Sequence, residues 1–145
     1  MTVRREWMSV LALAETAELE DAWSRMTDVP GHRHLRAPEI GLAMVRARAG
    51  GTGTRFNLGE MTVTRCSVEL DGGLVGHAYV GGRRQRHAEL AALFDALLQD
   101  PARRRAIESE VVVPLARAQA ARRRTVVARS APTRVEFFTM VRGED

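Results

Sequence analysis

Residues 60–99 decide the fold, and they read EMTVTRCSVELDGGLVGHAYVGGRRQRHAELAALFDALLQ. Apolar and polar residues alternate from Glu60 to Leu70 and again from Leu74 to Val80. This period of two is typical of a strand with one buried face. Asp71-Gly72-Gly73 lies between the two runs and is typical of a hairpin turn. The stretch therefore predicts two antiparallel strands.

A helix is expected after the hairpin, from about Arg86 to Gln99, because large apolar residues recur there at helical spacing. A further helical tract runs on to about Arg124, and Pro114 predicts a kink or a break within it. Before the hairpin, helical periodicity predicts a first helix from about Val3 to Ala14. A second helix follows, with Thr16 as its N-cap.

Two more strands complete the expected sheet. Gly41 to Ala49 alternates with a period of two, and Arg134 to Arg142 is rich in β-branched and aromatic residues. The prediction is an α+β fold, with an antiparallel sheet of about four strands, an N-terminal helical hairpin and C-terminal helices packed on the sheet. The length suits a single domain over residues 1–145.

The basic residues exclude several kinds of chemistry. All 22 of them are arginine, so a phosphate-loop lysine and a lysine Schiff base are impossible. Cys66 is the single cysteine, which excludes an intrachain disulfide and a multi-cysteine metal site. The net charge of +4 favours an anionic partner.

The chain is expected to work in the cytoplasm. No apolar run approaches the roughly 20 residues that a transmembrane helix needs, so no membrane role is expected. Arg4 and Arg5 are followed by a stretch that contains Trp and Glu rather than an apolar signal core, so no secretory signal is expected.

Gly50, Gly51, Thr52 and Gly53 form the first candidate site, because successive backbone N–H groups in a glycine loop can hold phosphate oxygens. The loop lacks the GK[ST] ending of a Walker motif and lies between strands. A plain flexible hairpin loop is the alternative.

The junction from Gly81 to His87 (GGRRQRH) is the second candidate, where a strand ends and a helix begins. Arg83, Arg84 and Arg86 oppose the positive end of the helix dipole unless an anion or carboxylates compensate. Free helix N–H groups and guanidinium groups would suit a triphosphate or a phosphonate. A solvated basic loop is the alternative.

His87 lies on the same helical stripe as Leu90 and Phe94, so it is either a half-buried structural histidine or a ligand-binding one. Glu89 lies two residues further along and does not share its face, although the two could line one pocket from opposite sides.

A three-residue turn would place Arg65 opposite Tyr79 and Ser67 opposite His77, on a polar face suited to a ligand, a subunit or solvent. The same register places Cys66 in the core, where packing is its expected role.

Metal and nucleic-acid sites are not expected. His32 and His34 lie on one side of an extended segment, but without an identifiable third ligand a loop is the preferred interpretation. The arginine triplets at 103–105 and 122–124 wrap around their helices instead of forming one basic stripe. Aromatic residues make up only 5% of the chain, too few for base-stacking platforms.

Three segments resemble the G subunit of the bacterial carbon-phosphorus lyase system, the PhnG family. They are GGTGTRFNLGEMTVTRCSVEL, GRRQRHAELAALFDALLQ and the ending RVEFFTMVRGED, and the opening REWMSVLALA is also similar. They occur in the order found in the family, and the resemblance extends over nearly the whole chain.

The resemblance implies a role in obtaining phosphorus from phosphonates. In that system the G, H and I subunits, with the L protein, support transfer of the ribose 5-triphosphate part of ATP to a phosphonate, and adenine leaves. G, H, I and J form a core complex, with I as the main nucleosidase subunit. ATP would be a substrate of the complex, no cofactor is expected on this chain alone, and the isolated chain is expected to be inactive.

The resemblance also carries over candidate residues without assigning a catalytic one. These are the glycine loop, the strand residues Glu60, Thr64 and Arg65, and Gly82, Arg83, His87 and Glu89 at the junction. The family usually has an acidic residue where this chain has Arg84, so a carboxylate role there is absent. The alternative function is a structural adaptor that braces the I subunit.

Overall fold

The computed structural model describes residues 3–48, 53 and 55–143. Two short helices come first, α1 (Arg4–Leu13) and α2 (Thr16–Ser24). Within the described residues they are followed by one sheet with three strands, β1 (His32–Arg48), β2 (Arg55–Leu70) and β3 (Val75–Gly81). The expected α+β class with an antiparallel sheet is therefore confirmed.

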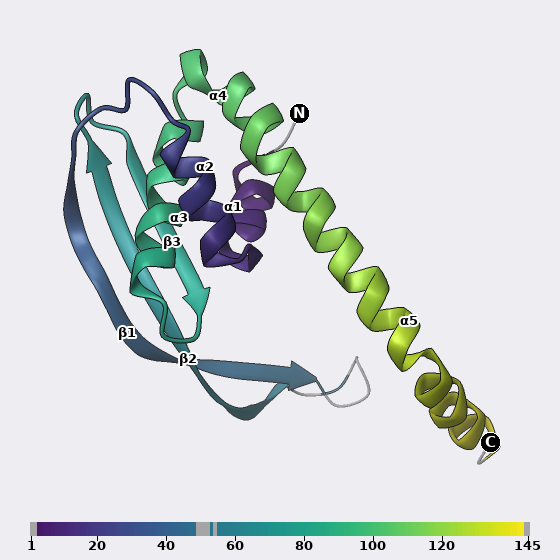
Figure 1. Cartoon of the computed structure of the whole chain (residues 1–145). Coiled ribbons are helices and arrows are strands. Elements are labelled where there is room, and N and C mark those ends of the chain that lie inside the picture. The colour runs from purple at the N-terminus through teal and green to yellow at the C-terminus, as the bar shows by residue number, and fades with distance from the viewer. Residues whose placement is uncertain (1–2, 49–52, 54, 144–145) are drawn as a thin grey trace.

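Helices form the rest of the chain. α3 (Gln85–Leu98) follows the sheet, and α4 (Pro101–Ile107) leads through a π-helical turn, η2 (Glu108–Val112), into the long α5 (Val113–Gly143). Figure 1 shows α3 and the N-terminal helices on one side of the sheet. β1 and β2 extend beyond them at one end, and α5 runs away from the body.

The hairpin register agrees with the three-residue turn at Asp71 to Gly73. The strand order is β1-β2-β3, with antiparallel neighbours, and Arg65 lies opposite Tyr79. Gly72 and Gly73 have φ values of +105° and +101°, a region that residues with a Cβ rarely adopt. The turn therefore needs its glycines, and it fixes which face of β2 is buried.

The core lies between α3 and one face of the sheet. On β2 the buried residues alternate as Thr64, Cys66, Val68 and Leu70, as expected for a strand with one covered face. α3 buries most of its side chains, including Phe94, whose ring meets that of Trp23 edge to face. Cys66 therefore packs in the core, as the sequence predicts.

A buried carboxylate joins three elements of this core. Asp95 on α3 has no exposed surface and accepts hydrogen bonds from Nε and Nη2 of Arg4, from Nε1 of Trp7 and from the backbone N–H of His77. These donors come from α1 and β3. A carboxylate without such partners would be costly to bury, so the four bonds stabilise one arrangement of α1, α3 and β3.

α5 is attached to the body only over its first turns within the part of the helix whose side chains are described. Gln119 donates a hydrogen bond to the backbone oxygen of Val10, 2.7 Å away, and Arg122 forms an ion pair with Glu18. Further along, Val126 and Val127 are 64% and 48% exposed. Residues 123–129 are all exposed, and Figure 1 shows α5 running away from the body.

The expected fourth strand is wrong, because residues 134–142 belong to α5. The segment is rich in β-branched and aromatic residues, but such propensities are weak and depend on context. A helix that is already formed lengthens at low cost, since each added residue contributes one hydrogen bond. The established helix before residue 134 outweighs the local preference.

Two strands also begin earlier than the sequence predicts. β1 starts at His32 instead of Gly41, so the interpretation of His32 to His34 as a loop is wrong. Pro38 hid this strand, but proline is tolerated in an edge strand where the register shifts. β2 starts at Arg55 instead of Glu60, because the end of the glycine-rich segment pairs with β1.

The N-cap of α2 differs from the sequence prediction, whereas the break near Pro114 agrees with it. The N-cap of α2 is Glu15 rather than Thr16, and Glu15 and Glu18 form a capping box. The break expected near Pro114 is present as the π-helical turn η2, which ends two residues before it. Proline removes an intrahelical donor, and such turns accommodate the disruption.

No helix within the described ranges is both long and apolar enough to cross a lipid bilayer.

Gly76 makes the close packing of β3 and α3 possible, which gives a first prediction. A Cβ at this position would lie 2.0 Å from the backbone oxygen of Ala92 and 2.7 Å from the backbone nitrogen of Ala96. We expect Gly76→Ala to lower the free energy of unfolding by about 2 kcal/mol or more, because helix backbone cannot yield like a side chain. Urea denaturation measures this change.

Gly41→Ala is the matched control for Gly76→Ala, because a Cβ at Gly41 meets nothing within 4 Å. Its expected change is within about 0.5 kcal/mol. Equal stability of the two variants would contradict the close approach of α3 to β3.

The second prediction concerns Asp95. Asp95→Ala leaves the Nε1–H of Trp7 and the backbone N–H of His77 without their acceptor. We expect a loss of about 3 kcal/mol or more in the free energy of unfolding. The control is Asp21→Ala, which breaks an exposed ion pair with Arg25 and changes stability by less than about 1 kcal/mol. A loss as small as that of the control would show that Asp95 does not hold these elements together.

Candidate functional site

The junction between β3 and α3 is held in place by Thr64. The hydroxyl of this buried residue donates to the backbone oxygen of Gly82, 2.6 Å away, and accepts from the backbone N–H of Arg84 at 2.9 Å. Gly82 has a φ of +85° and donates its own N–H to the backbone oxygen of Thr62. The Thr64 hydroxyl therefore fixes the backbone of the junction through these two hydrogen bonds, and Gly82 is needed for the turn.

Two of the junction arginines face solvent. Arg83 and Arg84 are exposed, and neither forms an ion pair with any described residue. The first turn of α3 contains no acidic residue, and its N-cap, Arg84, provides no side-chain hydrogen bond. Both guanidinium groups are thus available to an anion at the positive end of the helix.

Arg86 differs from the other two because it is neutralised by carboxylates. Its Nε contacts Oε1 of Glu20 on α2, and its Nη1 contacts Oε1 of Glu89 one turn further along α3. Hydrogen bonding to Glu20 is the main cause that raises the pKa of Arg86. Only part of the arginine cluster at the junction is therefore open to an external anion.

His87 points into the protein rather than toward the junction. It has no exposed surface: its Nε2 donates to the backbone oxygen of Leu11 at 2.9 Å, and its Nδ1 lies 3.0 Å from Oγ1 of Thr16. With Nε2 protonated, Nδ1 is left to accept from the Thr16 hydroxyl. Burial is the largest influence and lowers the pKa of His87, so the ring is neutral at pH 7. It links α3 to the end of α1 and to the first residue of α2.

Glu89 lies on another side of α3 and meets β1. Its Oε2 accepts a hydrogen bond from Nε2 of His34, 2.7 Å away, while its Oε1 contacts Arg86. Partial burial works against ionisation, but the bonds from Arg86 and His34 hold the pKa of Glu89 below its ordinary value. His87 and Glu89 therefore have separate neighbours and do not line a common pocket.

Arg65 lies on the opposite, outer face of the sheet. Its Nε donates to Oε1 of Glu39, 2.8 Å away, and the same oxygen accepts from Arg36. The hydrogen bonds from Arg36, which contributes most, and from Arg65 hold the pKa of Glu39 below its ordinary value. Arg65 is thus engaged in an ion pair. Neighbouring Ser67 lies opposite His77, as the sequence predicts, and is hydrogen-bonded to it. The structure does not bring Arg65 to the junction.

The remaining candidates lie elsewhere. Gly50, Gly51 and Thr52 are outside the described residues, and Gly53 is exposed. Glu60 is exposed on β2 opposite Met44. Thr62, beside the junction, lies seven positions along β2 from Arg55, where the strand begins, which is roughly 23 Å of extended chain. The beginning of β2 is therefore far from the junction.

Cys66 has the properties of a packing residue. Burial, with a smaller contribution from the charge of Glu89, raises the pKa of its thiol to about 11. A thiolate is the reactive form of cysteine, so this residue is unsuited to nucleophilic chemistry at pH 7.

Two features escape an analysis of sequence alone. Glu89 meets His34 across 55 residues of chain, and only the pairing of β1 with the sheet brings them together. Large apolar side chains also remain exposed where β1 and β2 extend past α3, among them Leu42 and Leu58 at 67% and 63%. In the sequence, the alternation of His32 and His34 is the signal for the first feature. The apolar residues of the segments 40–44 and 56–61 are the signal for the second.

Comparison with known proteins identifies the family. The family model described as phosphonate metabolism protein PhnG matches residues 2–143. The chain belongs to the PhnG family. This PhnG-family chain is also 49% identical over 142 residues to a protein of Rhizobium meliloti (strain 1021), covering 98% of the chain and 90% of that relative. The relative is named alpha-D-ribose 1-methylphosphonate 5-triphosphate synthase subunit PhnG.

The third prediction separates structure from binding at the junction. His87→Ala removes two buried hydrogen bonds and leaves a cavity, so we expect the free energy of unfolding to fall by about 2–4 kcal/mol. Arg83→Ala in this PhnG-family chain is expected to change it by less than about 0.5 kcal/mol, because the side chain is exposed. Thermal and urea denaturation of both variants measure the difference. An unchanged stability of His87→Ala would contradict the structural role.

Proposed function

We propose that this chain is a subunit of a complex that transfers the ribose 5-triphosphate moiety of ATP to a phosphonate, with release of adenine. The similarity to a relative named as a subunit of ribose 1-methylphosphonate 5-triphosphate synthase supports this assignment, because it extends over 98% of the chain. ATP and the phosphonate are substrates of the complex, whose other members are the H, I and J subunits. The L protein acts with it, in the cytoplasm.

Within that complex we infer an assembly role, and one observation carries it. Ile40, Leu42 and Met44 on β1 continue the face of the sheet that elsewhere packs against α3. Their exposed fractions are 39%, 67% and 52%. A row of exposed apolar side chains that no described element covers is typical of a protein contact surface.

The neighbouring strand supports the same role. Phe56, Leu58 and Met61 on β2 are 46%, 63% and 44% exposed, so the projecting hairpin carries apolar side chains on both strands. We call this projection, β1 from Ile40 and β2 up to Met61, the arm. Figure 1 shows that it extends beyond the helices. The arm is suited to insertion between elements of the I subunit, which it would brace as an adaptor.

A direct contribution to the reaction is the second candidate function, and the free arginines favour it. Displacement at an anomeric carbon beside a triphosphate requires cations that hold the anion more than it requires a nucleophile. Arg83 and Arg84 are exposed and have no ion-pair partner in the described part of the chain. They would hold a phosphate or phosphonate group once a partner subunit closes over the junction.

The fourth prediction tests the assembly role. The chain is co-expressed with the I subunit, and co-purification is followed by gel filtration. We expect Leu42→Asp to abolish the pair, because a charge on the arm opposes burial of that surface. Leu13→Asp is the matched control: Leu13 is also 67% exposed but lies at the end of α1, so the pair should persist. Retention of the pair by Leu42→Asp would contradict the arm as its interface.

Adenine release separates the two functions. The assembled complex is assayed with Arg83→Ala, alone and together with Arg84→Ala. A loss of activity without loss of assembly assigns the junction to the substrate site. Full activity of the double variant leaves the chain as an adaptor. If wild-type complexes release no adenine from ATP in the presence of a phosphonate, the proposed reaction is wrong.

A further inference from the structure

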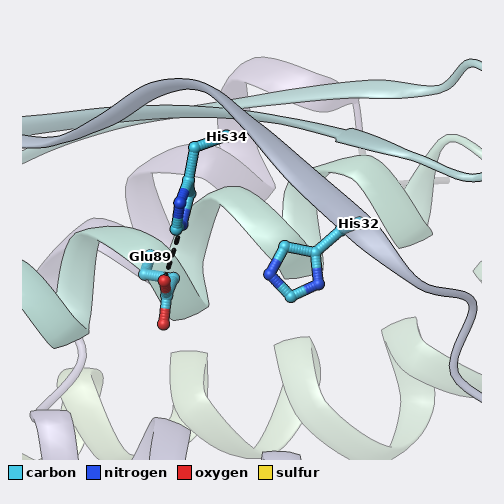
Figure 2. A group of neighbouring side chains, drawn as sticks. All are labelled: His32, His34 and Glu89. Carbon is cyan, nitrogen blue, oxygen red and sulfur yellow. Dashed lines mark hydrogen bonds and ion pairs between the residues drawn. The ribbon is translucent and has the colours of Figure 1, made fainter.

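His32 and His34 lie on the same face of β1. In the register they stand opposite Leu70 and Val68, both of which are buried under α3. Side chains opposite one another in an antiparallel pair share a face, so both imidazoles are on the helix side of the sheet. Glu89 reaches the same place from α3, and Figure 2 shows the three side chains together.

The three side chains are close enough to share one ion. Nε2 of His34 lies 2.7 Å from Oε2 of Glu89, the centres of the two imidazole rings are 5.8 Å apart, and one ligand atom from each residue lies within 4.8 Å of the others. Two ligands of a tetrahedral zinc ion are about 3.4 Å apart when the metal bonds are about 2.1 Å long. Small side-chain rotations therefore suffice to form a site.

The donor set is that of a known class of metal centre. Two neutral imidazoles and one carboxylate are the protein ligands of open zinc sites, in which water takes the fourth position. Harder cations such as Mg²⁺ prefer oxygen ligands only, so they do not suit two histidines. The set therefore favours zinc or a similar divalent transition metal.

The surroundings hold the carboxylate in place and limit the repulsion on a cation. Arg86 binds Oε1 of Glu89 and leaves Oε2 facing His34. The positive charge of Arg86 is itself paired with Glu20. Arg33 does not face the site, because it pairs with Glu69, and odd and even residues of a strand point to opposite faces. A ligand carboxylate fixed by a second residue is typical of metal centres.

We propose that His32, His34 and Glu89 bind one zinc-class divalent ion, with water at the remaining position. The ion joins the beginning of β1, an edge strand, to α3. The side chains of His34 and Glu89 are 36% and 20% exposed, so the bound water is open to replacement by an oxygen ligand. The site does not depend on the function proposed above.

The fifth prediction tests this site on the full chain, with any histidine tag removed and the metal stripped by a chelator. Calorimetric titration with ZnCl₂ should give one equivalent bound to the wild type. Binding of Co²⁺ should give the intense visible absorption of a tetrahedral ion. We expect His32→Ala and His34→Ala each to weaken zinc binding by roughly 100-fold or more, and Glu89→Gln by roughly tenfold or more.

The controls separate a metal site from adventitious binding. His77→Ala removes a histidine on the outer face of the sheet and should leave the zinc affinity unchanged. Zinc should therefore raise the melting temperature of the wild type and of His77→Ala, but should raise that of His32→Ala and His34→Ala much less. Glu89→Gln keeps the shape of the side chain, and circular dichroism verifies that each variant is folded. The proposal is overturned if the wild type binds no zinc, or if the His34→Ala and His77→Ala variants bind it equally well.

Discussion

The four hydrogen bonds to Asp95 are the constraint on which the rest of the structure depends. A carboxylate with no exposed surface is tolerated only when its oxygens are satisfied, and here the donors come from α1 and β3. α1 and β3 must therefore meet α3 at one position along its length. Gln99 strengthens the arrangement by donating to the backbone oxygen of Val75.

This position of α3 has two consequences for function. β3 and α3 approach so closely that only glycine fits at residue 76. This close packing fixes the position of the junction where α3 begins. α3 also covers the sheet only as far as the junction. The apolar face continues past it into the arm, so the packing that completes the core also leaves Leu42 and Met44 uncovered. In this way the exposed apolar surface of the arm follows from the position of one helix.

The sequence predicts the parts of the fold that local patterns determine. Alternation and a three-residue turn place Arg65 opposite Tyr79, and the helical stripe locates α3 to within one residue at each end. The prediction fails for residues 134–142, where a growing helix outweighs strand propensity, and for the beginning of β1, where exposed arginines and Pro38 hide the alternation. The role of Asp95 and the contact between His34 and Glu89 could not be predicted, because these contacts join residues far apart in the chain.

The net charge of +4 becomes informative only after the paired charges are separated from the free ones. Arg4 is neutralised by Asp95, Arg65 by Glu39, and Arg86 by Glu20 and Glu89. In both arginine triplets, members are also paired: Arg103 with Asp100 and Arg122 with Glu18. Such pairing reduces the long-range field that would attract a polyanion such as nucleic acid.

Arg83 and Arg84, by contrast, lie together at a helix N-terminus, where attraction is short-range and suited to a single phosphate or phosphonate group. The distribution of the charges, rather than their sum, therefore favours a small anion over nucleic acid.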